Sequence, residues 1–590
     1  MSITEVPVLI VGGGGCGLAA SIFLSDLNID HLVIERRLTG SGLPKAHYLN
    51  QRTMEIFRQH ALADAIYEVG TPIEKMGSVN WATSLGGDGP LDRRSLGRLD
   101  AFGGGALRET YSRDSPCLSS NYPQSRLEPL LRDVAEERGP GRVRFHHELT
   151  RLRQDSDGVT ASVTDLDSRE SYSVRAQYVI AADGGKTVGP MSGIEMTGQT
   201  GLLDMISVHF SADLSGYYDD ADMMTWLINP DGWDGCGLVQ MGPTWGAQSE
   251  EWVLNSVLPP DDPARNEHSL MPDRVRGLLK LPDLEMRVHR INSWIIEGVV
   301  AERYQDGRIF LAGDAAHRHP PTTGLGLNTA FQDAHNLAWK LAAVLSGQAS
   351  AALLATYAAE RQPIGTRNVD WAMFTFFNHL VLDPGFGLLP GAAPEQNVQA
   401  LAAFFADDPM GQTRRARAAH VLDTQRTEFQ AHDLEIGFSY DVGALIPDGT
   451  ERPERDPMGA TYRPSTRPGH RLPHAWLEHD GRRLSTHDLS PHSSGFALIT
   501  GPDGDAWLDA ARQAADRFGI QLTAIKVGEH GEYLDTDGRW RAVCQISDAG
   551  AVLIRPDKHI AWRISGAPEG SHVDALIGAL TEILRPAPPE

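Results

Sequence analysis

Residues 311–328 read LAGDAAHRHPPTTGLGLN, a stretch that joins the end of an apolar strand to a carboxylate, a Pro-Pro corner and a glycine-rich turn. A glycine after the expected strand lets the backbone turn and places Asp314 at the carboxyl end of that strand. Downstream, Gly324 and Gly326 lead into a long amphipathic run over residues 329–345. Exposed N–H groups at the start of a helix favour an anionic or electron-rich ligand, so this stretch predicts a cofactor cradle.

A second glycine-rich turn follows the first apolar strand of the chain. Residues 6–11 read VPVLIV, and residues 12–17 supply G-x-G-x-x-G before a helical stretch and a second strand that ends at Glu35. This order is typical of a dinucleotide-binding unit, in which the glycines admit a pyrophosphate and the acid accepts a ribose hydroxyl. An acid at this position favours FAD or NAD over NADP. A surface glycine loop with an incidental acid is the alternative for this motif alone.

Further polar residues stand where a dinucleotide would meet them. Lys45, His47 and Arg52 flank the start of an expected helix, and cations there would hold a pyrophosphate or a developing negative charge. Solvated charge on a helix is the alternative for His47. Gln124 begins a helix predicted over residues 121–138, either as a cap or as an amide contact to a ligand.

Another apolar strand, predicted over residues 178–182, ends in Asp183-Gly184. This arrangement repeats the logic of the first glycine turn and offers a second carboxylate for ligand hydroxyls. The strand is expected to follow a shorter one over residues 172–176.

The middle of the chain has a different composition. Between about residues 190 and 284 aromatic and Met residues concentrate, among them Met205, Met224, Trp226 and Trp233. Alternating stretches such as LLDMISVHFSADL and GCGLVQMGPTW predict strands of a separate antiparallel sheet. These side chains either form an ordinary core or line a pocket for a flat apolar substrate.

The remaining chain alternates helices and strands. Residues 392–426 predict helix and residues 434–440 predict a strand, before a stretch rich in Pro, Gly and charge over residues 447–468 that marks a boundary. Beyond it the order strand (FALIT), helix (AWLDAARQAADRFG), strand (LTAIKVG) and two further strands (AVLIRP and HIAWRI) predicts a small α/β domain.

Size and composition set limits on function. A chain of 590 residues with 41% apolar residues predicts roughly two to four domains. No run of about 20 apolar residues predicts a membrane span, and the apolar amino-terminal segment, broken by glycines, is expected to be a strand rather than a signal peptide. The formal net charge of −24 argues against a nucleic-acid partner.

The four cysteines form neither a C-x-x-C pair nor a zinc spacing, which predicts a reducing cytoplasm. We therefore expect a cytoplasmic protein without nucleic-acid or membrane partners. We also expect the protein to be a homodimer.

With these motifs together, the sequence resembles the class A (single-component) FAD-dependent aromatic hydroxylases, the group around para-hydroxybenzoate hydroxylase. The resemblance rests on residues 12–17 with Glu35-Arg36, on Asp183-Gly184 and on residues 313–328. NQRTMEI and GDAAHRHPPT resemble the phenol-hydroxylase branch, which includes 2,4-dichlorophenol 6-monooxygenase-like enzymes and polyketide hydroxylases. PGHRLPHAWL and AVLIRPDKHIAWR resemble the carboxy-terminal thioredoxin-like domain of that branch, here without its C-x-x-C.

The resemblance implies a fold and a domain order. The fold class is α/β, with a Rossmann-type FAD-binding domain of the glutathione-reductase kind, an inserted antiparallel-sheet substrate domain and a C-terminal thioredoxin-like domain. The FAD-binding domain is expected over residues 1–75, 116–190 and 286–445, the last part including a helical region. The substrate domain is expected over residues 76–115 and 191–285, and the thioredoxin-like domain over residues 446–590.

The resemblance also implies the cofactor contacts. FAD would be held along the chain by Gly12, Gly14, Gly17, Glu35, Arg36, Lys45, Arg52, Gln124, Asp183, Asp314, Pro321, Gly324, Gly326, Leu327 and Asn328. Of these, the glycines of residues 12–17 would face the pyrophosphate, Glu35 the adenosine ribose, Arg52 the isoalloxazine, and residues 324–328 the flavin pyrimidine edge.

The implied reaction is aromatic hydroxylation by an NAD(P)H-dependent flavoprotein monooxygenase. Hydride from NAD(P)H reduces FAD, O2 adds to form a flavin hydroperoxide, and its distal oxygen attacks a phenolic or polycyclic aromatic substrate. The catalytic residues are expected to be His47 as base or orienting group, Arg52, and Pro321, whose carbonyl would steer oxygen transfer. His209, Tyr217 and His289 compete with His47 for the base role.

Two other functions stay open at this point. The same cofactor chemistry carries out Baeyer–Villiger or epoxidising oxygen insertion on a polyketide, and a chain of another class would be a non-catalytic FAD-binding carrier. We expect no metal site, because the His317 and His319 pair has no identifiable third ligand.

Overall fold

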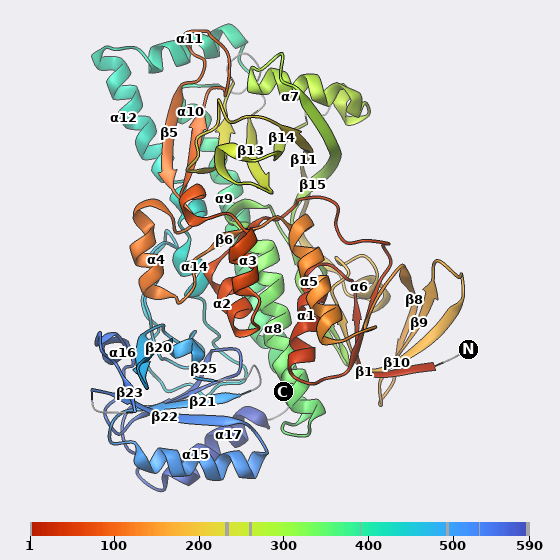
Figure 1. Cartoon of the computed structure of the whole chain (residues 1–590), viewed down its shortest axis with the longest axis vertical. Helices are drawn as coiled ribbons and strands as arrows, with labels where there is room; N and C mark the ends of the chain where they lie inside the picture. The colour runs from red at the N-terminus through yellow and green to blue at the C-terminus, as the bar shows by residue number, and fades with distance from the viewer. Residues whose placement is uncertain are drawn as a thin grey trace.

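The structure, a computed structural model, describes residues 3–229, 235–258, 262–389, 391–490, 495–529 and 532–585. Trp233, one of the aromatic residues singled out in the sequence, lies outside these ranges. Along its long axis the molecule has three parts: a C-terminal lobe drawn in blue, a central part around the first large sheet, and an upper part around the second (Figure 1).

The first sheet contains five neighbouring parallel strands. Its order is β16 (Gln305–Asp306), β17 (Ile309–Leu311), β10 (Ser171–Ala181), β1 (Ile3–Val11), β2 (His31–Glu35) and β7 (Val143–Phe145), with β9 (Val159–Asp165) and β8 (His147–Gln154) branching from β10. β1 pairs in parallel with β2 and β10, and β10 pairs in parallel with β17. The strand predicted over residues 6–11 and the strand expected just before Gly313 are confirmed, while the two predicted over residues 172–182 form one strand.

The register of these strands brings distant parts of the chain to one edge. Val11 pairs with both Ala181 and Ile34, and Ala181 pairs with Leu311. The residues that follow β1, β2, β10 and β17 therefore meet at the carboxyl ends of the sheet, which is where open α/β sheets bind ligands.

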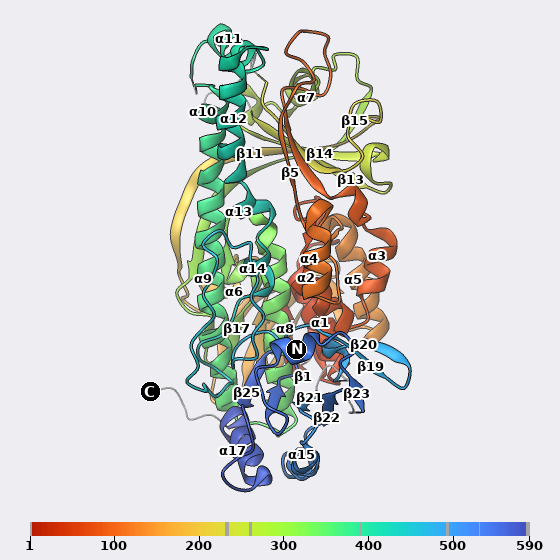
Figure 2. The ribbon, with the colours of Figure 1, turned by 90° about the vertical axis from the view of Figure 1, so that its left-hand side faces the viewer.

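Helices cover the first sheet and connect it to the upper part. α1 (Gly15–Asp26) packs between α5 (Gln124–Arg138) and α8 (Leu325–Leu345). α9 (Ala355–Asn378) runs along α8 and continues upward to the second sheet (Figure 2). The helices predicted over residues 121–138 and 329–345 are confirmed, since every third or fourth side chain, such as Leu127, Leu131 and Leu337, is fully buried.

The second sheet combines three chain segments. Its order is β18 (His317–Arg318), β15 (Met286–Ala301), β11 (Met196–Ala212), β14 (Glu251–Val257), β13 (Cys236–Gly242), β12 (Asp222–Leu227), β4 (Ser78–Ala82) and β5 (Ser95–Asp100). The strands are antiparallel except that β12 and β4 are parallel. The stretch 311–328 thus leaves the first sheet at β17, joins the second at β18 and enters α8, so it ties both sheets together.

The third sheet forms the C-terminal lobe. Its order is β20 (Arg482–Ser485), β19 (Trp476–His479), β23 (Tyr533–Leu534), β22 (Leu522–Gly528), β21 (Phe496–Thr500), β24 (Ala551–Ile554) and β25 (Ile560–Ile564). β21 and β22 are parallel and joined through α15 (Asp505–Phe518), whereas β24 and β25 are antiparallel and precede α17 (His572–Leu584). The predicted order of strands and helix is confirmed.

Two predictions between the second and third sheets need correction. Residues 434–440 do not form a strand, because they begin inside helix α14 (His432–Ile436). Alternating apolar residues suggested a strand, yet polar residues between them are also buried and have partners: Glu435 accepts a hydrogen bond from the Tyr48 hydroxyl at 2.8 Å. The helix expected over residues 392–426 is interrupted and forms α11 (Pro394–Phe404), α12 (Pro409–Asp423) and a short α13 (Arg426–Phe429).

None of the helices in the described ranges is long and apolar enough to cross a membrane.

Candidate active site

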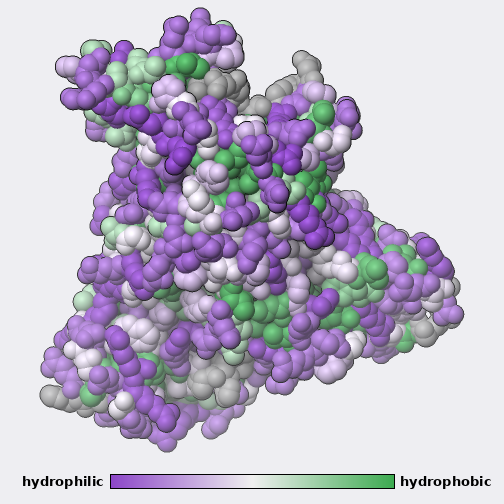
Figure 3. All heavy atoms as spheres, turned by 45° about the horizontal axis from the view of Figure 1, so that its top comes forward, coloured by the Kyte–Doolittle hydropathy of each residue, from purple (hydrophilic) through white to green (hydrophobic). Residues whose placement is uncertain are grey.

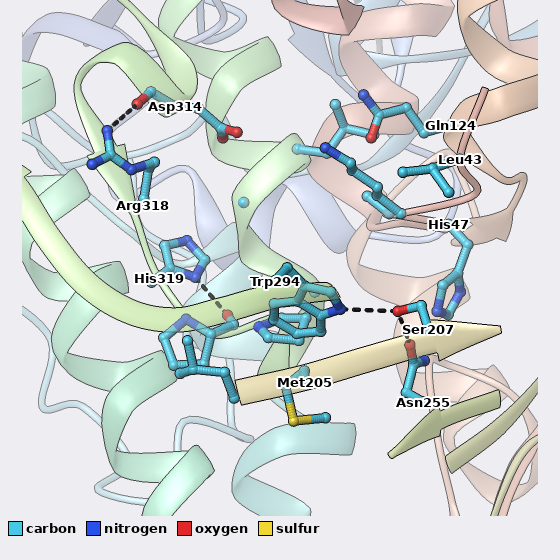
Figure 4. Close-up of a pocket in the computed structure, with 18 of the residues that line it drawn as sticks. Leu43, His47, Gln124, Met205, Ser207, Asn255, Trp294, Asp314, Arg318 and His319 are labelled. Carbon is cyan, nitrogen blue, oxygen red and sulfur yellow. Dashed lines mark hydrogen bonds between the residues drawn. The ribbon is translucent and has the colours of Figure 1, made fainter. Parts of the chain in front are cut away.

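One large cavity, of about 1160 Å³, runs from the carboxyl edge of the first sheet to the face of the second. Its wall includes the glycine turn after β1, the segment after β17 and side chains of β11, β14 and β15. Figure 4 shows part of this cavity, with Gln124, Leu43 and His47 on one side and Asp314, Arg318 and His319 on the other. The motifs that the sequence separates by hundreds of residues therefore border a single space.

The first glycine turn makes two close approaches that only glycine permits. Gly12 has φ +109°, and a Cβ there would lie 2.2 Å from the Ala182 carbonyl oxygen. A Cβ on Gly17 would lie 1.9 Å from the Gly12 oxygen, so Gly17 lets α1 pack on β1. Gly12 and Gly14 border the cavity, whereas Gly17 is absent from its wall. The third glycine thus shapes the turn from behind instead of facing a ligand.

Glu35 ends β2 beside this turn and borders the cavity together with the exposed Arg36. One carboxylate oxygen accepts the Gly13 N–H at 2.8 Å and the other accepts the Arg37 N–H at 2.8 Å. Each oxygen has a further lone pair, so the carboxylate is held rigidly and can still accept a hydroxyl of a ribose.

Glu128 is a cavity residue that the sequence did not single out. Its carboxylate accepts hydrogen bonds from Gly15 N at 3.2 Å, from the Gln124 amide at 2.6 Å and from Ser41 N at 2.5 Å. Gln124 and Glu128 lie one turn apart on α5, and both border the cavity. The i, i+4 spacing on a predicted helix was a signal for this pair.

Asp183 and Asp314 behave differently although both follow a strand. Asp183 accepts hydrogen bonds from the backbone N–H groups of Gly185, Thr187 and Val188 at 3.1, 2.7 and 2.8 Å. Its carboxylate borders the cavity but is largely used in capping its own turn. The Asp314 side chain is exposed to the cavity and makes no hydrogen bond within the described residues, so it is the acceptor available to a ligand.

Lys45 supplies positive charge to the same region. Its ammonium borders the cavity, where burial lowers the pKa of Lys45 and the charge of Asp314 opposes that shift. A cation near Asp314 and the glycine turn suits a pyrophosphate. A phosphate oxygen would pair with the Lys45 ammonium and compensate for the hydration that the ammonium loses on burial.

The glycine-rich segment before α8 supplies the opposite wall. Pro321, Gly324, Gly326 and Leu327 border the cavity. Gly324 has φ +64°, and a Cβ there would lie 2.8 Å from the Tyr48 ring. The residue before it, Thr323, also has a left-handed φ of +64°, which is a strained conformation for a β-branched side chain.

Asn328 does not contact the cavity. It is fully buried, and its side chain accepts the Asn50 N–H at 3.0 Å and donates to the Tyr48 and Gly324 carbonyls at 2.9 and 2.6 Å. Asn328 therefore fastens the glycine-rich segment to the chain around Tyr48, and its effect on a flavin would be indirect.

His47 lies where the sequence placed it, in the cavity wall. Its Nδ1 lies 2.8 Å from Asn121 Oδ1, and the Asn121 amide donates to Thr71 Oγ1 at 2.8 Å. This network assigns the proton to Nδ1 and leaves Nε2 as an acceptor. Burial lowers the pKa of His47 to about 4, with the Asn121 hydrogen bond opposing the shift, so the ring is neutral at pH 7.

Arg52 does not approach the cavity, contrary to the expectation that it contacts an isoalloxazine. It is 2% exposed, forms an ion pair with Glu55 at 3.1 Å and donates to the Asp557 carbonyl of the C-terminal lobe at 2.7 Å. Asn50 caps α2 (Gln51–Gln59), and the helix turns Arg52 away from the His47 side.

The H-x-H pair has ordinary partners. His317 Nε2 lies 2.9 Å from Asp333 Oδ2, and His319 Nδ1–H donates to the Pro320 carbonyl at 2.8 Å. No cluster of His, Cys, Asp and Glu suited to a metal ion occurs among the described residues.

Side chains of the second sheet complete the cavity. Leu203, Met205, Ser207 and His209 alternate along β11, and Asn255 and Trp294 join them from neighbouring strands. Trp294 Nε1–H donates to Ser207 Oγ at 2.9 Å, and the Ser207 hydroxyl donates to Asn255 Oδ1 at 2.6 Å (Figure 4). Of the competing bases, His209 borders the cavity, while His289 and the exposed Tyr217 do not.

The sequence also missed further ionisable residues of the wall, among them His379, Asp383 and Glu428. His379 and Asp383 share one helical face with Phe376 and Leu380, at spacings of three, four and seven residues. That periodicity was readable, but its pairing with Glu428 depends on how two helices pack.

Comparison with known proteins gives the family. A family model described as an FAD binding domain matches residues 5–372, and a second, described as the C-terminal part of aromatic-ring hydroxylases, matches residues 465–587. The chain belongs to the FAD-binding aromatic-ring hydroxylases. The family inferred from the sequence motifs is confirmed.

Relatives of this family align with the whole chain. The chain is 35% identical to 2,4-dichlorophenol 6-monooxygenase of Delftia acidovorans, over 99% of each protein. It is 34% identical to tetracenomycin B2 monooxygenase-dioxygenase of Streptomyces olivaceus, also over 99% of each. The chain is accordingly a flavin-dependent monooxygenase.

Solved structures of the family have the same overall fold. The flavin-dependent monooxygenase PieE, in complex with FAD and substrate, superposes with a TM-score of 0.92 at 37% identity, over 98% of this chain and 99% of that one. Aklavinone-11 hydroxylase, in a ternary complex with FAD and aklavinone, superposes with a TM-score of 0.78 at 30% identity, over 99% and 100% of the chains. This aromatic-ring hydroxylase therefore has a mixed α/β fold with several sheets and a C-terminal hydroxylase domain.

Proposed function

We propose that this monooxygenase hydroxylates a phenolic or polycyclic aromatic substrate, with FAD as cofactor and NAD(P)H and O2 as co-substrates. The observation that carries the proposal is the continuous cavity, which joins a dinucleotide-type turn to an apolar chamber on the second sheet. The names of the relatives support it, since they act on chlorophenol, phenol and polyketide rings.

The residues present fit FAD. Gly12 and Gly14 leave the space that a Cβ would fill, Glu35 can accept ribose hydroxyls, and Asp314 offers an unused carboxylate between the two. Lys45 would pair with a phosphate, and the start of α8 at Gly326 and Leu327 would lie against the flavin ring, where helix N–H groups favour negative charge.

FAD, when bound, supplies the chemistry that uses NAD(P)H and activates O2. The chain's own contribution is to orient the substrate ring and to hold water away from it. Met205 and Trp294 close one side of the chamber with apolar surface, and exclusion of water would protect the activated oxygen from loss as H2O2.

His47 would act on the substrate hydroxyl. Its neutral ring presents Nε2 as an acceptor, which can take the proton of a phenol or orient it. The Pro321 backbone at the facing wall would border the place of oxygen transfer.

We propose that residues 446–590 form a thioredoxin-like domain, and the order of strands in the C-terminal lobe supports this. β21, α15 and β22 form a parallel unit, and β24, β25 and α17 follow on the other side of β21. Its cysteine, Cys544, is buried, and burial raises the pKa of its thiol, which opposes thiolate chemistry. A docking role suits this lobe better than disulfide exchange.

We also propose that the enzyme is a homodimer. Phe374, Phe377 and Val381 are 49%, 45% and 41% exposed along α9 and the short 3-10 turn after it, and a second copy would cover such apolar side chains. Light scattering of the purified protein tests this, with Phe377→Glu expected to lower the molar mass and the wild type expected at twice the chain mass.

Purified protein tests the function directly. We expect a yellow protein that oxidises NAD(P)H faster when a phenol or naphthol is added. A colourless protein that never oxidises NAD(P)H would contradict the proposal, whereas H2O2 release without a hydroxylated product would mean that the substrate is wrong.

A further inference from the structure

Three ionisable side chains lie together in the apolar wall of the substrate chamber, away from the residues expected to contact FAD. His379 Nε2 lies 2.5 Å from Glu428 Oε2, and their side chains are only 15% and 8% exposed. Asp383 borders the same part of the cavity and makes no hydrogen bond through its carboxylate within the described residues. We name His379, Glu428 and Asp383 the distal subsite.

The surroundings of the distal subsite are aromatic. The Trp226 ring lies 4.8 Å from the His379 ring, and Phe429, next to Glu428, lies 5.7 Å from Trp81 and 5.8 Å from Phe102. Burial in this wall raises the pKa of Asp383 to about 6, with His379 opposing the shift. Polar groups in an apolar wall lose hydration when a ligand enters, so they penalise a ligand that offers them no hydrogen bond.

The position of the distal subsite follows from α9. Thr322 and Thr323, beside Pro321, bond to Ala372 and Thr375 of this helix at 2.7 and 3.2 Å. His379 follows Thr375 by four residues at the end of α9, which is just over one helical turn or about 6 Å further along the axis. The distal subsite therefore lies one turn beyond the wall where oxygen transfer is proposed.

A second path, along aromatic side chains of the chamber wall, also separates the distal subsite from the glycine-rich segment. From Tyr48, which touches the glycine-rich segment at Gly324, the ring of Phe102 lies 4.7 Å away and that of Phe429 follows at 5.8 Å. Two successive aromatic contacts thus separate the expected flavin edge from the residue beside Glu428.

The distal subsite is held firmly. The Asn378 amide donates to the Thr424 carbonyl at 3.1 Å, and the Gln425 amide donates to the Asn378 carbonyl at 3.0 Å. These bonds fix the helical turn that carries His379 against the turn that carries Glu428. A preorganised pair of this kind favours recognition of a fixed ligand group.

We propose that the distal subsite binds a hydroxyl group of a polycyclic aromatic substrate, on a ring other than the one that is hydroxylated. This inference rests on the proposed function and narrows its substrate class to fused aromatic rings with hydroxyls on separate rings. The imidazole Nδ1 and the carboxylates of Glu428 and Asp383 supply the acceptors, and Trp226 supplies a flat apolar contact for the ring between them.

Two matched probes test the proposal on the FAD-loaded enzyme: a dihydroxynaphthalene with one hydroxyl on each ring, and its mono-O-methyl ether. Dissociation constants come from the change in flavin absorbance, without turnover. We expect wild type to bind the diol about 10-fold or more tightly than the ether, as expected for a hydrogen bond to a charged group. The double variant His379→Phe with Glu428→Leu removes both members of the ion pair and should bring that ratio closer to one, with the Asp383 carboxylate as the acceptor that remains.

The conservative single variants Glu428→Gln and Asp383→Asn keep side-chain size and are expected to lower the ratio in part, while His420→Gln, on the exposed face of α12, should leave it unchanged. An unchanged ratio in the double variant and in both single variants, or equal binding of both probes by wild type, would overturn the distal subsite and leave the hydroxylase function standing. An enzyme whose NAD(P)H oxidation responds to no aromatic compound would instead overturn the proposed function.

Discussion

The Nδ1 atom of His47 lies 2.8 Å from Oδ1 of Asn121, and this bond fixes which nitrogen of the ring faces the cavity as an acceptor. Asn121 is itself oriented by Thr71, so the arrangement joins three segments of the chain, around residues 47, 71 and 121. A ring held neutral and correctly oriented before the substrate arrives is what a base for a phenol requires.

His47→Phe should lower kcat for hydroxylation by about 10²-fold or more, in the range for loss of a general base. FAD binding should not change, because His47 is expected to meet the substrate. Asn121→Ala should have a smaller effect, since the ring keeps its position but loses its fixed tautomer. Product formation by liquid chromatography and flavin absorbance measure the two quantities, and a full rate in His47→Phe would exclude the base role.

Gly17→Ala should prevent stable FAD binding. A Cβ there would lie 1.9 Å from the Gly12 oxygen, so α1 must move away from β1 and the glycine turn must open. The purified variant should contain little flavin and melt at a lower temperature. Gly216→Ala is the matched control, because a Cβ at Gly216 meets nothing within 4 Å, and equal flavin content in the two variants would contradict the packing account.

Arg555→Ala should weaken the contact between the C-terminal lobe and α9 and lower the free energy of unfolding. Arg555 makes a two-fold ion pair with Glu360 of α9 at 2.7 and 2.9 Å, and both side chains are fully buried. Removing one partner of such a pair costs about 3–5 kcal/mol, because the other charge remains buried.

Urea unfolding followed by tryptophan fluorescence measures this loss. Arg541→Ala removes a solvent-exposed pair with Asp548 in the same lobe and should change the free energy of unfolding little. Similar effects of the two substitutions would show that the buried network does not hold the lobe.

Thr323→Gly should raise the melting temperature of the protein but lower the fraction of NAD(P)H oxidation that leads to hydroxylated product. Thr323 has φ +64°, a left-handed conformation that costs roughly 1–2 kcal/mol in a residue with a Cβ. Glycine removes that cost but also removes the hydroxyl that contacts Thr375, which loosens the wall at Pro321. We expect a higher melting temperature and more H2O2 for each NAD(P)H consumed, and an unchanged ratio of H2O2 to product would argue against a functional role for the strain.

Acid should destabilise the fold in a specific pH window. Burial lowers the pKa of His31, His47, His319 and His559 to about 4, against about 6.5 in an unfolded chain. Between these values the unfolded chain binds more protons, so stability is fully present above pH 6.5 and is lost as the pH falls towards 4. The melting temperature, measured at saturating FAD, should fall steadily as the pH is lowered from 6.5 towards 4. A melting temperature that does not change with pH would show that these rings are not held neutral.

The parts of the site that follow directly from strand ends were predictable from sequence. Gly12, Glu35, Asp183 and Asp314 each follow an apolar run, and the parallel register that joins Val11, Ala181 and Leu311 brings them together as expected. Local signals sufficed because a strand followed by a glycine turn has few alternatives.

Side-chain direction was less predictable. Arg52 was placed at the cofactor because it stands near His47, but its partner is a carbonyl 505 residues further along the chain. Asn328 and Asp183 likewise make their hydrogen bonds mainly to nearby backbone groups, which leaves few for a ligand in the cavity. Such outcomes depend on which lobe packs against each helix face, and a single sequence does not contain that information.

The distal subsite has one feature that was predictable from the sequence and one that was not. The spacing of Phe376, His379, Leu380 and Asp383 was readable as one helix face, and Figure 3 shows apolar surface gathered in the hollow between the two upper lobes of the molecule. The pairing of His379 with Glu428, 49 residues away, required the packing of two helical segments.

The central claim is that the cavity carries out oxygen transfer from O2 to an aromatic ring. The direct measurement is a turnover of the FAD-loaded enzyme with NAD(P)H and a hydroxynaphthalene under isotopically heavy O2, with the product analysed by mass spectrometry. The account predicts one heavy oxygen atom in each newly formed hydroxyl group. A hydroxylated product that carries only oxygen from water would contradict it.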